Sequence, residues 1–203
     1  MPAVKTHTAD LASELVDAAG RILAAEGAAA LTLRRLAQTA GTSTMAVYTL
    51  FGDKQGLLAA MYREGYHRLG AAMAEAVAEA TAKQEPPLDV LARFGRAYRA
   101  AALANPHLYD LMFGRPVPGF SPDADAKEVA DSTFRPMVEA VQRCLDAGDL
   151  VGDDAERIGF HLWAVTHGMV SLELAGHLPG DKALRDHAYE EALVLSSWPF
   201  LRL

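Results

Sequence analysis

The sequence predicts an all-α protein built from two helical domains, and three observations support this. The chain has 203 residues, of which 51% are apolar, so it can bury a sizeable core. Apolar side chains recur at three- and four-residue spacing through most of the chain, as on one face of a helix. No stretch shows the sustained alternation of Val, Ile and Thr that is typical of strands.

Three helices are predicted in the N-terminal part. They span about residues 8–26, 33–40 and 44–50. Thr8 is expected to cap the first helix and Thr32 the second, because a Ser or Thr hydroxyl accepts from a free N–H of the first turn. Either Thr42 or Ser43 is expected to cap the third.

Six further helices are predicted. They span about residues 54–83, 88–103, 106–114, 123–147, 154–176 and 182–198. The long fourth helix ends at Pro86-Pro87. Residues 114–122 hold three prolines and two glycines and are predicted to form a loop. Pro136 is expected to kink the helix around it or to mark a boundary inside it.

The second and third helices have the spacing of a helix-turn-helix. Ala37 is small where the two helices would cross, Gly41 suits the positive φ of the turn, and Val47 would plug the third helix into the core. The opposite face of the third helix has little to bury. A short braced helix with an exposed face is what enters a DNA major groove.

The motif extends beyond the generic pattern. In order, the chain has Thr-Leu-x-x-Leu-Ala, Ala-Gly-Thr-Ser, Val-Tyr-x-x-Phe and Lys-x-x-Leu-Leu within residues 32–58. With the preceding helix, residues 8–60 resemble the DNA-binding domain of the TetR family of bacterial repressors. The resemblance implies that Tyr48 and Lys54 touch the DNA backbone. The alternatives are a partly buried core aromatic for Tyr48 and a solvated charge for Lys54.

Other contacts to DNA are expected around the same helix. Thr32, Thr42 and Ser43 could contact phosphate beside free N–H groups at helix N-termini, or act as caps only. The expected base readers are Thr44, Met45 and Thr49. None of these can make the bidentate contacts of Arg with guanine or Asn with adenine. We therefore expect an A/T-containing site that is partly read through DNA shape.

The excess of acidic side chains that gives the net charge of −7 lies outside this motif. Residues 1–60 carry five basic and five acidic side chains, so the rest of the chain accounts for the whole excess. A neutral DNA-binding segment must rely on a few placed contacts and on helix N-termini. We expect moderate affinity with a shallow dependence on salt.

The second half shows a weaker resemblance. Asn-Pro-His-Leu-Tyr-x-Leu-Met-Phe-Gly at residues 105–114, with Trp163, His167 and Gly168, resembles a TetR C-terminal class named for a Trp/His/Gly signature. That resemblance implies a DNA-binding domain at 1–60, a connecting helix at 54–83, and an effector-binding and dimerisation domain at 61–203. It also implies an interior effector site and a homodimer in which the last two helices form a four-helix bundle with the partner.

Aromatic and Met side chains of the second domain could line a pocket for a small apolar or aromatic effector, although each alone could be ordinary core. The candidates are Phe94, Tyr98, Met112, Phe113, Phe134, Met137, Phe160, Trp163, His167 and Met169. The apolar side chains expected at the dimer surface are Val165, Val170, Leu172, Leu174, Leu184, Leu193 and Leu195.

Other classes of protein lack their signals. The seven histidines form no HxxxH or HExxH pair, so no metal and no cofactor are expected. The sequence has no GxSxG, Walker or dinucleotide-binding motif, which argues against an enzyme. Four polar residues interrupt the apolar run 158–178, and no secretory signal is apparent. A lone Cys144 fits a reducing cytosol, so a cytoplasmic protein is expected.

The sequence thus predicts a transcriptional repressor that a small-molecule effector releases from a palindromic DNA operator. Two alternatives stay open. The first is a regulator without a small-molecule inducer, and a continuous apolar cavity would count against it. The second is an all-α protein that binds hydrophobic ligands and whose helix-turn-helix is incidental.

Overall fold

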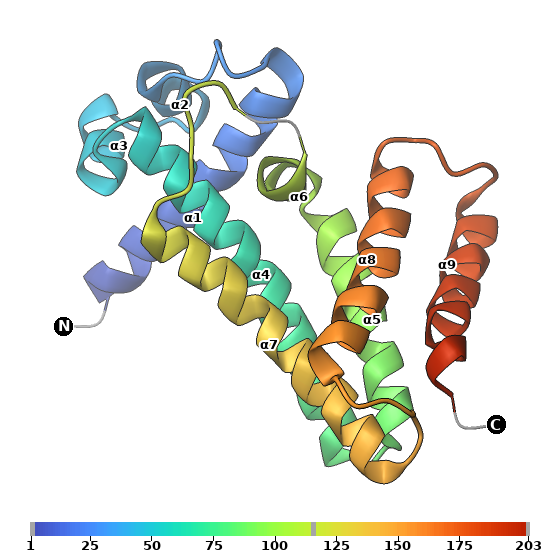
Figure 1. The fold of residues 1–203 in the computed structure, drawn as a ribbon. Coiled ribbons are helices and arrows are strands. Elements are labelled where there is room, and N and C mark those ends of the chain that lie inside the picture. Colours follow the sequence, from blue (N-terminus) through green and yellow to red (C-terminus); the bar gives the residue numbers. More distant parts are fainter. Residues whose placement is uncertain (1–2, 115–116, 202–203) are drawn as a thin grey trace. The chain divides into compact units, whose positions relative to one another are not determined.

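The computed structural model of the chain describes residues 3–114 and 117–201 (Figure 1). The described residues form nine α-helices and one short 3₁₀ helix, η1. They are α1 (Ala3–Glu26), α2 (Leu33–Thr39), α3 (Thr44–Phe51), α4 (Lys54–Ala82), α5 (Pro87–Ala104), α6 (Pro106–Phe113), α7 (Ala124–Ala147), α8 (Ala155–Leu174), α9 (Lys182–Ser197) and η1 (Trp198–Phe200). Within this part of the chain, extended pairing is limited to a single bridge between Leu150 and Leu201. The all-α prediction is confirmed.

Most helix boundaries agree with the sequence signals to within two residues, and two expectations need correction. The first helix begins at Ala3 and includes Thr8, because no Gly or Pro separates the two and Thr is only mildly unfavourable inside a helix. Pro136 marks no boundary and lies inside α7, where the buried residues that follow hold the helix together. The end of the last α-helix agrees with the prediction to within one residue: α9 ends at Ser197, and Pro199 lies in the 3₁₀ turn that follows.

The chain packs as two compact units. Unit 1 comprises residues 1–67 and 105–130, and unit 2 comprises residues 68–104 and 131–203. The division falls within α4, within α7, and between α5 and α6. These packing units differ from the functional domains expected at 1–60 and 61–203, because α6 packs against α1 rather than with α5. The functional domain assignment stays a prediction.

Unit 1 is built on a core that the helix-turn-helix shares with α1, α4 and α6. Its buried side chains come from every one of these helices and from the loop before α2, and they include Leu15, Ile22, Leu31, Leu36, Val47, Leu57, Met61, Leu108 and Leu111. Gly65 on α4 lets α6 come close, because a Cβ there would overlap Met112. Burying the inner face of α3 in this way fixes which of its residues remain outside.

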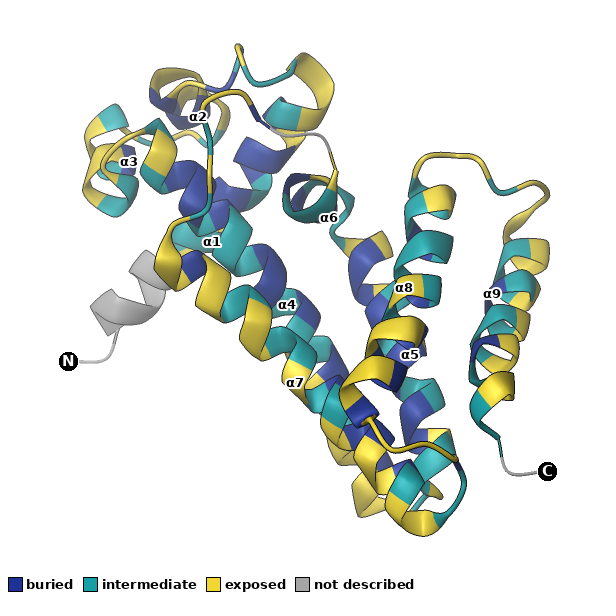
Figure 2. Cartoon of the chain, in the orientation of Figure 1, coloured by how far each residue is buried: buried dark blue, intermediate teal, exposed yellow. Residues whose placement is uncertain are grey.

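Unit 2 buries one side of α5, α7, α8 and α9 (Figure 2). Its buried side chains include Phe94, Tyr98, Met137, Val141, Cys144, Ile158, Leu162, Val170 and Tyr189. The hydroxyl of Tyr189 on α9 donates to the carbonyl of Gly95 on α5 at 2.6 Å. A Cβ at residue 95 would lie 2.7 Å from Leu193, so this glycine allows α9 to approach α5. Burial raises the pKa of the Cys144 thiol to about 11.

A buried arginine joins three helices of unit 2. Arg99 on α5 donates to both oxygens of Glu173 on α8 at 2.7 and 2.8 Å, and to Asp186 on α9 at 2.8 Å. The Arg99 and Glu173 side chains are only 12% and 10% exposed. The guanidinium also lies 4.9 Å from the centre of the Tyr189 ring. These hydrogen bonds raise the pKa of Arg99 and lower that of Glu173, so both stay charged.

Removing this arginine is expected to destabilise unit 2. Arg99→Met keeps an apolar stem of similar length but leaves Glu173 in the interior with Arg185, 3.6 Å away, as its remaining cation. Breaking a buried ion pair from one side costs a few kcal/mol, so we expect a loss of about 3 kcal/mol in the free energy of unfolding. Urea denaturation followed by Trp fluorescence measures it.

The matched control is Arg157→Met, which breaks an exposed pair with Asp153 in the same unit. Exposed pairs contribute little, so this variant should lose less than about 0.5 kcal/mol. Equal losses for the two variants would show that the Arg99 network does not stabilise the unit.

Candidate nucleic-acid interface and ligand cavity

The turn between α2 and α3 has the geometry that the sequence predicts for a helix-turn-helix. Ala37 is buried where α2 and α3 pack together, and Val47 is completely buried. Gly41 has a φ of +66°, a conformation that side chains with a Cβ rarely adopt. These three positions set the turn and pack the inner face of α3 into the core of unit 1.

Hydroxyl groups cap both helices of the motif. The Thr32 Oγ1 accepts from the backbone N–H of Arg35 at 3.1 Å, and the Ser43 Oγ accepts from that of Ala46 at 3.0 Å. Ser43 is therefore the cap of α3, and the backbone N–H of Thr42 donates to Ala37 instead. The capping function of Thr32 and Ser43 is established by these contacts, whereas phosphate contact by either residue stays a prediction.

The outer face of α3 is open to solvent. Met45 is 73% exposed and Tyr48 is 53% exposed, so Tyr48 is not the core aromatic that was its alternative. Thr44 is half-buried at the first turn. The Thr49 hydroxyl donates to the carbonyl of Met45 at 2.9 Å, which leaves its lone pairs and its methyl group for a ligand. This face can offer apolar contacts, single acceptors and the Tyr48 hydroxyl.

Two of the basic side chains near the motif, Lys54 and Arg35, contact other groups of the protein. The Lys54 ammonium donates to the carbonyl of Ala28 and so braces the turn after α1, a contact that no sequence pattern predicted. An ammonium has three donors, so this contact leaves two for a phosphate. Arg35 pairs with Glu26 at 3.1 Å, while Arg34 is exposed. Asp53 caps α4 through the N–H of Gly56 at 2.8 Å.

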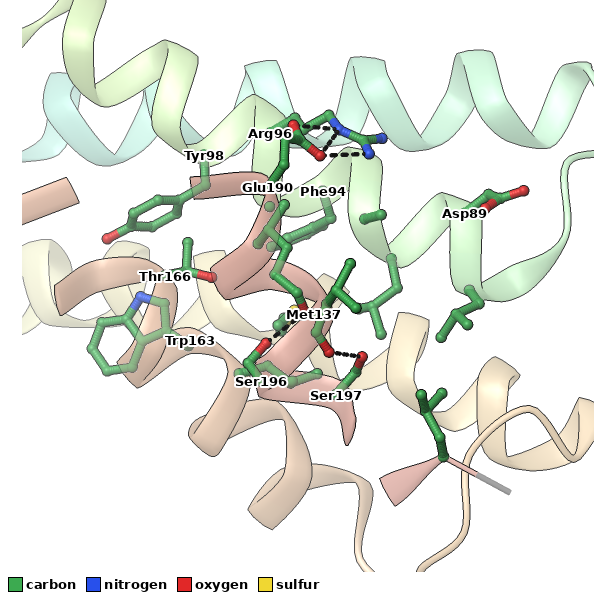
Figure 3. A pocket seen from close by; sticks show the side chains of 18 residues that line it. Asp89, Phe94, Arg96, Tyr98, Met137, Trp163, Thr166, Glu190, Ser196 and Ser197 are labelled. Atoms are coloured by element: carbon green, nitrogen blue, oxygen red, sulfur yellow. Dashed lines mark hydrogen bonds and ion pairs between the residues drawn. The ribbon is translucent and has the colours of Figure 1, made fainter. Parts of the chain in front are cut away.

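Unit 2 contains a cavity of about 250 Å³ between α5, α8 and α9 (Figure 3). Four of the predicted pocket residues line it: Phe94, Tyr98, Met137 and Trp163. Apolar side chains such as Leu91, Leu162 and Leu193 form much of the remaining wall. The polar wall residues are Asp89, Arg96, Thr166, Glu190, Ser196 and Ser197.

The other predicted pocket residues lie outside this wall. Met112 and Phe113 belong to α6 in unit 1, where Phe113 packs on the rings of Tyr66 and Tyr109. Phe134 and Phe160 form an aromatic cluster with Trp163, with ring centres 5.5 to 6.2 Å apart. They support the cavity wall from behind.

His167 does not line the cavity itself but contacts Tyr98, which does. Its Nδ1 lies 3.1 Å from the Tyr98 hydroxyl and its Nε2 lies 3.4 Å from the Ser171 hydroxyl. Burial lowers the pKa of His167, so the ring is neutral at neutral pH and one of its nitrogens can accept a hydrogen bond from Tyr98. His167 thus orients Tyr98, which does line the cavity.

Sequence inspection missed the charged part of the wall. Arg96 pairs with Glu190, which lies 94 residues further along the chain, and no local pattern links the two. The sequence offered one indication of this charged wall. Asp89, Ala92 and Arg96 lie at three- and four-residue spacing and so share one face of α5.

Two kinds of site considered in the sequence analysis, a metal site and a membrane span, can be compared with the described residues. In the part of the chain that the structure describes, no three His, Cys, Asp or Glu side chains are grouped to hold a metal ion. None of the helices formed by residues 3–114 and 117–201 is long and apolar enough to cross a membrane.

Two protein-family models match the chain. The family described as bacterial regulatory proteins, tetR family, matches residues 15–61, and the tetracyclin repressor-like C-terminal domain matches residues 91–195. HTH-type transcriptional regulator Rv1816 of Mycobacterium tuberculosis is 28% identical over 195 residues, which cover 83% of this chain and 82% of that protein.

Several solved structures are similar to this chain over most of its length. A protein with unknown function from Rhodococcus sp. RHA1 is 31% identical with a TM-score of 0.78, covering 95% of this chain and 96% of that one. The putative regulatory protein SCO4313 is 29% identical with a TM-score of 0.71, covering 94% and 98%. The TetR-family regulator PfmR from Thermus thermophilus is 19% identical with a TM-score of 0.72, covering 91% and 97%, and shares the fold.

The braced α3 helix with its open outer face, together with these matches, defines a helix-turn-helix DNA-binding protein. The chain belongs to the TetR family and is a transcriptional regulator. Proteins of this family bind DNA operators and form dimers. The narrower Trp/His/Gly class stays a prediction that rests on Trp163, His167 and Gly168.

The cap of α3 can be tested without DNA. Ser43→Ala removes the acceptor of the Ala46 N–H and should destabilise α3 by about 1 kcal/mol. Amide hydrogen exchange in a peptide covering α3 should accelerate roughly fivefold. Ser43→Asn restores an acceptor and should exchange at nearly the original rate. Equal acceleration in both variants would contradict the capping function.

Proposed function

We propose that the protein is a repressor that binds a palindromic operator as a homodimer and leaves it when a small molecule occupies the cavity of unit 2. The observation that carries the DNA-binding part is the outer face of α3, with Met45 and Tyr48 more than half exposed on a helix whose inner face is buried. The cavity of about 250 Å³ supports the ligand-controlled part.

At the operator, α3 lies in the major groove. Tyr48 and Lys54 contact the DNA backbone and set the position of the helix without reading sequence. Thr32, Thr42 and Ser43 lie beside helix N-termini, where free N–H groups favour a phosphate. Thr44, Met45 and Thr49 face the bases through methyl groups and single acceptors, which suits thymine methyls.

The dimer forms through α8 and α9. Among the apolar residues predicted there, Leu172, Leu184 and Leu195 are 44%, 51% and 60% exposed, and Val194 and Trp198 add exposed apolar surface. Val170 does not contribute, because it is completely buried inside its own subunit. A second copy that covers this surface spaces the two recognition helices about 34–36 Å apart, one helical turn of DNA.

The effect of ligand binding is transmitted to the recognition helix α3 by helices that connect the two units along the chain. Helix α5 lines the cavity and is separated only by Asn105 from α6, which belongs to unit 1. Helix α4 runs from the helix-turn-helix into unit 2. A tenfold release from the operator requires about 1.4 kcal/mol of differential ligand affinity, and the operator must weaken ligand binding by the same factor.

The two alternatives are less well supported. A regulator without a small-molecule inducer has no need for an internal cavity between α5, α8 and α9. A hydrophobe-binding protein with an incidental helix-turn-helix does not account for an open face on α3. The DNA-binding variants below separate that second alternative from the proposal.

Operator binding is tested with a sequence selected from random DNA at low salt. Tyr48→Phe removes one hydroxyl and should weaken binding roughly tenfold per hydrogen bond lost. Lys54→Ala should lower the salt slope by about 0.9 per subunit, since one phosphate contact disappears. Fluorescence anisotropy at several salt concentrations measures both.

Lys83→Ala, one residue beyond the C-terminal end of α4, is the charge-matched control and should leave the affinity and the salt slope unchanged. Unfolding curves confirm that Lys54→Ala is folded despite its lost contact with Ala28. Selection of no sequence at low salt, or binding by Tyr48→Phe and Lys54→Ala at the original strength, would disprove the proposed interface.

The dimer surface is tested by placing a charge in it. Leu195→Glu puts a carboxylate at the centre of an apolar contact and should convert the protein to a monomer at micromolar concentration, as measured by sedimentation. Leu103→Glu changes a leucine on α5 that is 38% exposed and should leave the mass unchanged. A dimeric Leu195→Glu protein would place the interface elsewhere.

A further inference from the structure

The charged residues of the cavity wall carry an excess of negative charge. Arg96 on α5 donates to both oxygens of Glu190 on α9 at 2.8 to 3.0 Å, so its positive charge is balanced by that carboxylate. This contact lowers the pKa of Glu190 and keeps it ionised. Asp89, nearer the start of α5 on the same wall, adds a second carboxylate. Figure 3 shows the Arg96–Glu190 pair and Asp89 along α5.

Each arginine of α5 is already paired with a carboxylate. Arg93 pairs with Glu85 at 2.5 and 2.6 Å, and Arg99 is held by Glu173 and Asp186. With Arg96 committed to Glu190, the three guanidinium groups of the helix are all neutralised by carboxylates. A carboxylate or phosphate ligand would therefore meet a guanidinium whose charge is already balanced by Glu190, and it would be repelled by Glu190 and Asp89.

Two hydroxyl groups of the wall, those of Ser196 and Ser197, can act only as acceptors toward a ligand. The Ser196 hydroxyl donates to the carbonyl of Leu193, and the Ser197 hydroxyl donates to that of Val194, both at 2.8 Å. Each hydroxyl has only one proton, so it can offer a ligand only its lone pairs. These two oxygens and the Glu190 carboxylate favour a ligand that donates hydrogen bonds.

The apolar part of the wall fits the body of a small ligand. Phe94, Met137 and Trp163 line it, and the ring of Trp163 can also attract a cation to its face. An apolar cavity of about 150 Å³ accepts benzene, so about 250 Å³ has room for a phenyl ring with a short chain.

We propose that the cavity binds a small lipophilic amine in its protonated form, with the ammonium group against Glu190 and the apolar body between Phe94, Met137 and Trp163. This inference rests on the proposed ligand-controlled function and names the chemical class of the effector. Glu190 sets the specificity: it shares its two oxygens between Arg96 and the ammonium, and it repels an anion.

Three probes that differ only in the head group test the inference. They are 3-phenylpropylamine, 3-phenylpropan-1-ol and 3-phenylpropionate, and their affinities are measured by isothermal titration calorimetry at pH 7. The amine should bind at least tenfold more tightly than the acid, with the alcohol between them. In Glu190→Gln the amine should weaken about tenfold and the acid should gain, because Arg96 loses its carboxylate.

Glu191→Gln is the matched control, since Glu191 neighbours Glu190 on α9 but does not line this cavity. It removes the same charge from the chain and should leave all three affinities unchanged. Circular dichroism and sedimentation check that both variants keep their fold and their oligomeric state.

Three outcomes would overturn the inference: an acid that binds as tightly as the amine, no binding of any probe at millimolar concentration, or the same amine-to-acid ratio in Glu190→Gln. Operator binding of the same samples without a probe is measured separately. Loss of operator binding would reject the proposed function, whereas a wrong order of probes with intact operator binding rejects only the amine specificity.

Discussion

The ion-pair network of Arg99 is the constraint on which the architecture of unit 2 depends. A single guanidinium on α5 holds a carboxylate of α8 and one of α9 while lying against the Tyr189 ring. The same three helices form most of the cavity wall. A ligand that separates α5 from α9 must therefore break the hydrogen bond of Arg99 to Asp186 and its contact with the Tyr189 ring.

The helix-turn-helix of unit 1 lies in a segment with little net charge. Residues 1–60 carry five basic and five acidic side chains, and two nearby cations, Lys54 and Arg35, have partners within the protein. The capped ends of α2 and α3 then matter more than in a basic domain, because a helix N-terminus attracts phosphate without a charged side chain. Such an interface depends on the exact placement of α3, and Ala37, Gly41 and Val47 provide it.

Local patterns predicted the secondary structure well, because caps, glycines and apolar spacing act over a few residues. Ser43 caps α3 and Gly41 has a positive φ, as their local sequence patterns predict. The cavity was predicted only in part, since Met112 is as apolar as Met137 and no sequence pattern tells which packing unit α6 joins. Long-range pairs such as Arg96 with Glu190 and Lys54 with Ala28 lay beyond any periodicity argument.

The buried thiol of Cys144 has a consequence for the chemistry of the whole chain. It is the only cysteine, it is completely enclosed by α7 and its neighbours, and its pKa of about 11 keeps it protonated. Oxidants and electrophiles attack the thiolate of an accessible cysteine, and this chain presents none. The Cys144 thiol is therefore not expected to react while the protein is folded. A single cysteine introduced on α3 or α9 would be the one site that a thiol-reactive dye or spin label modifies in the folded protein.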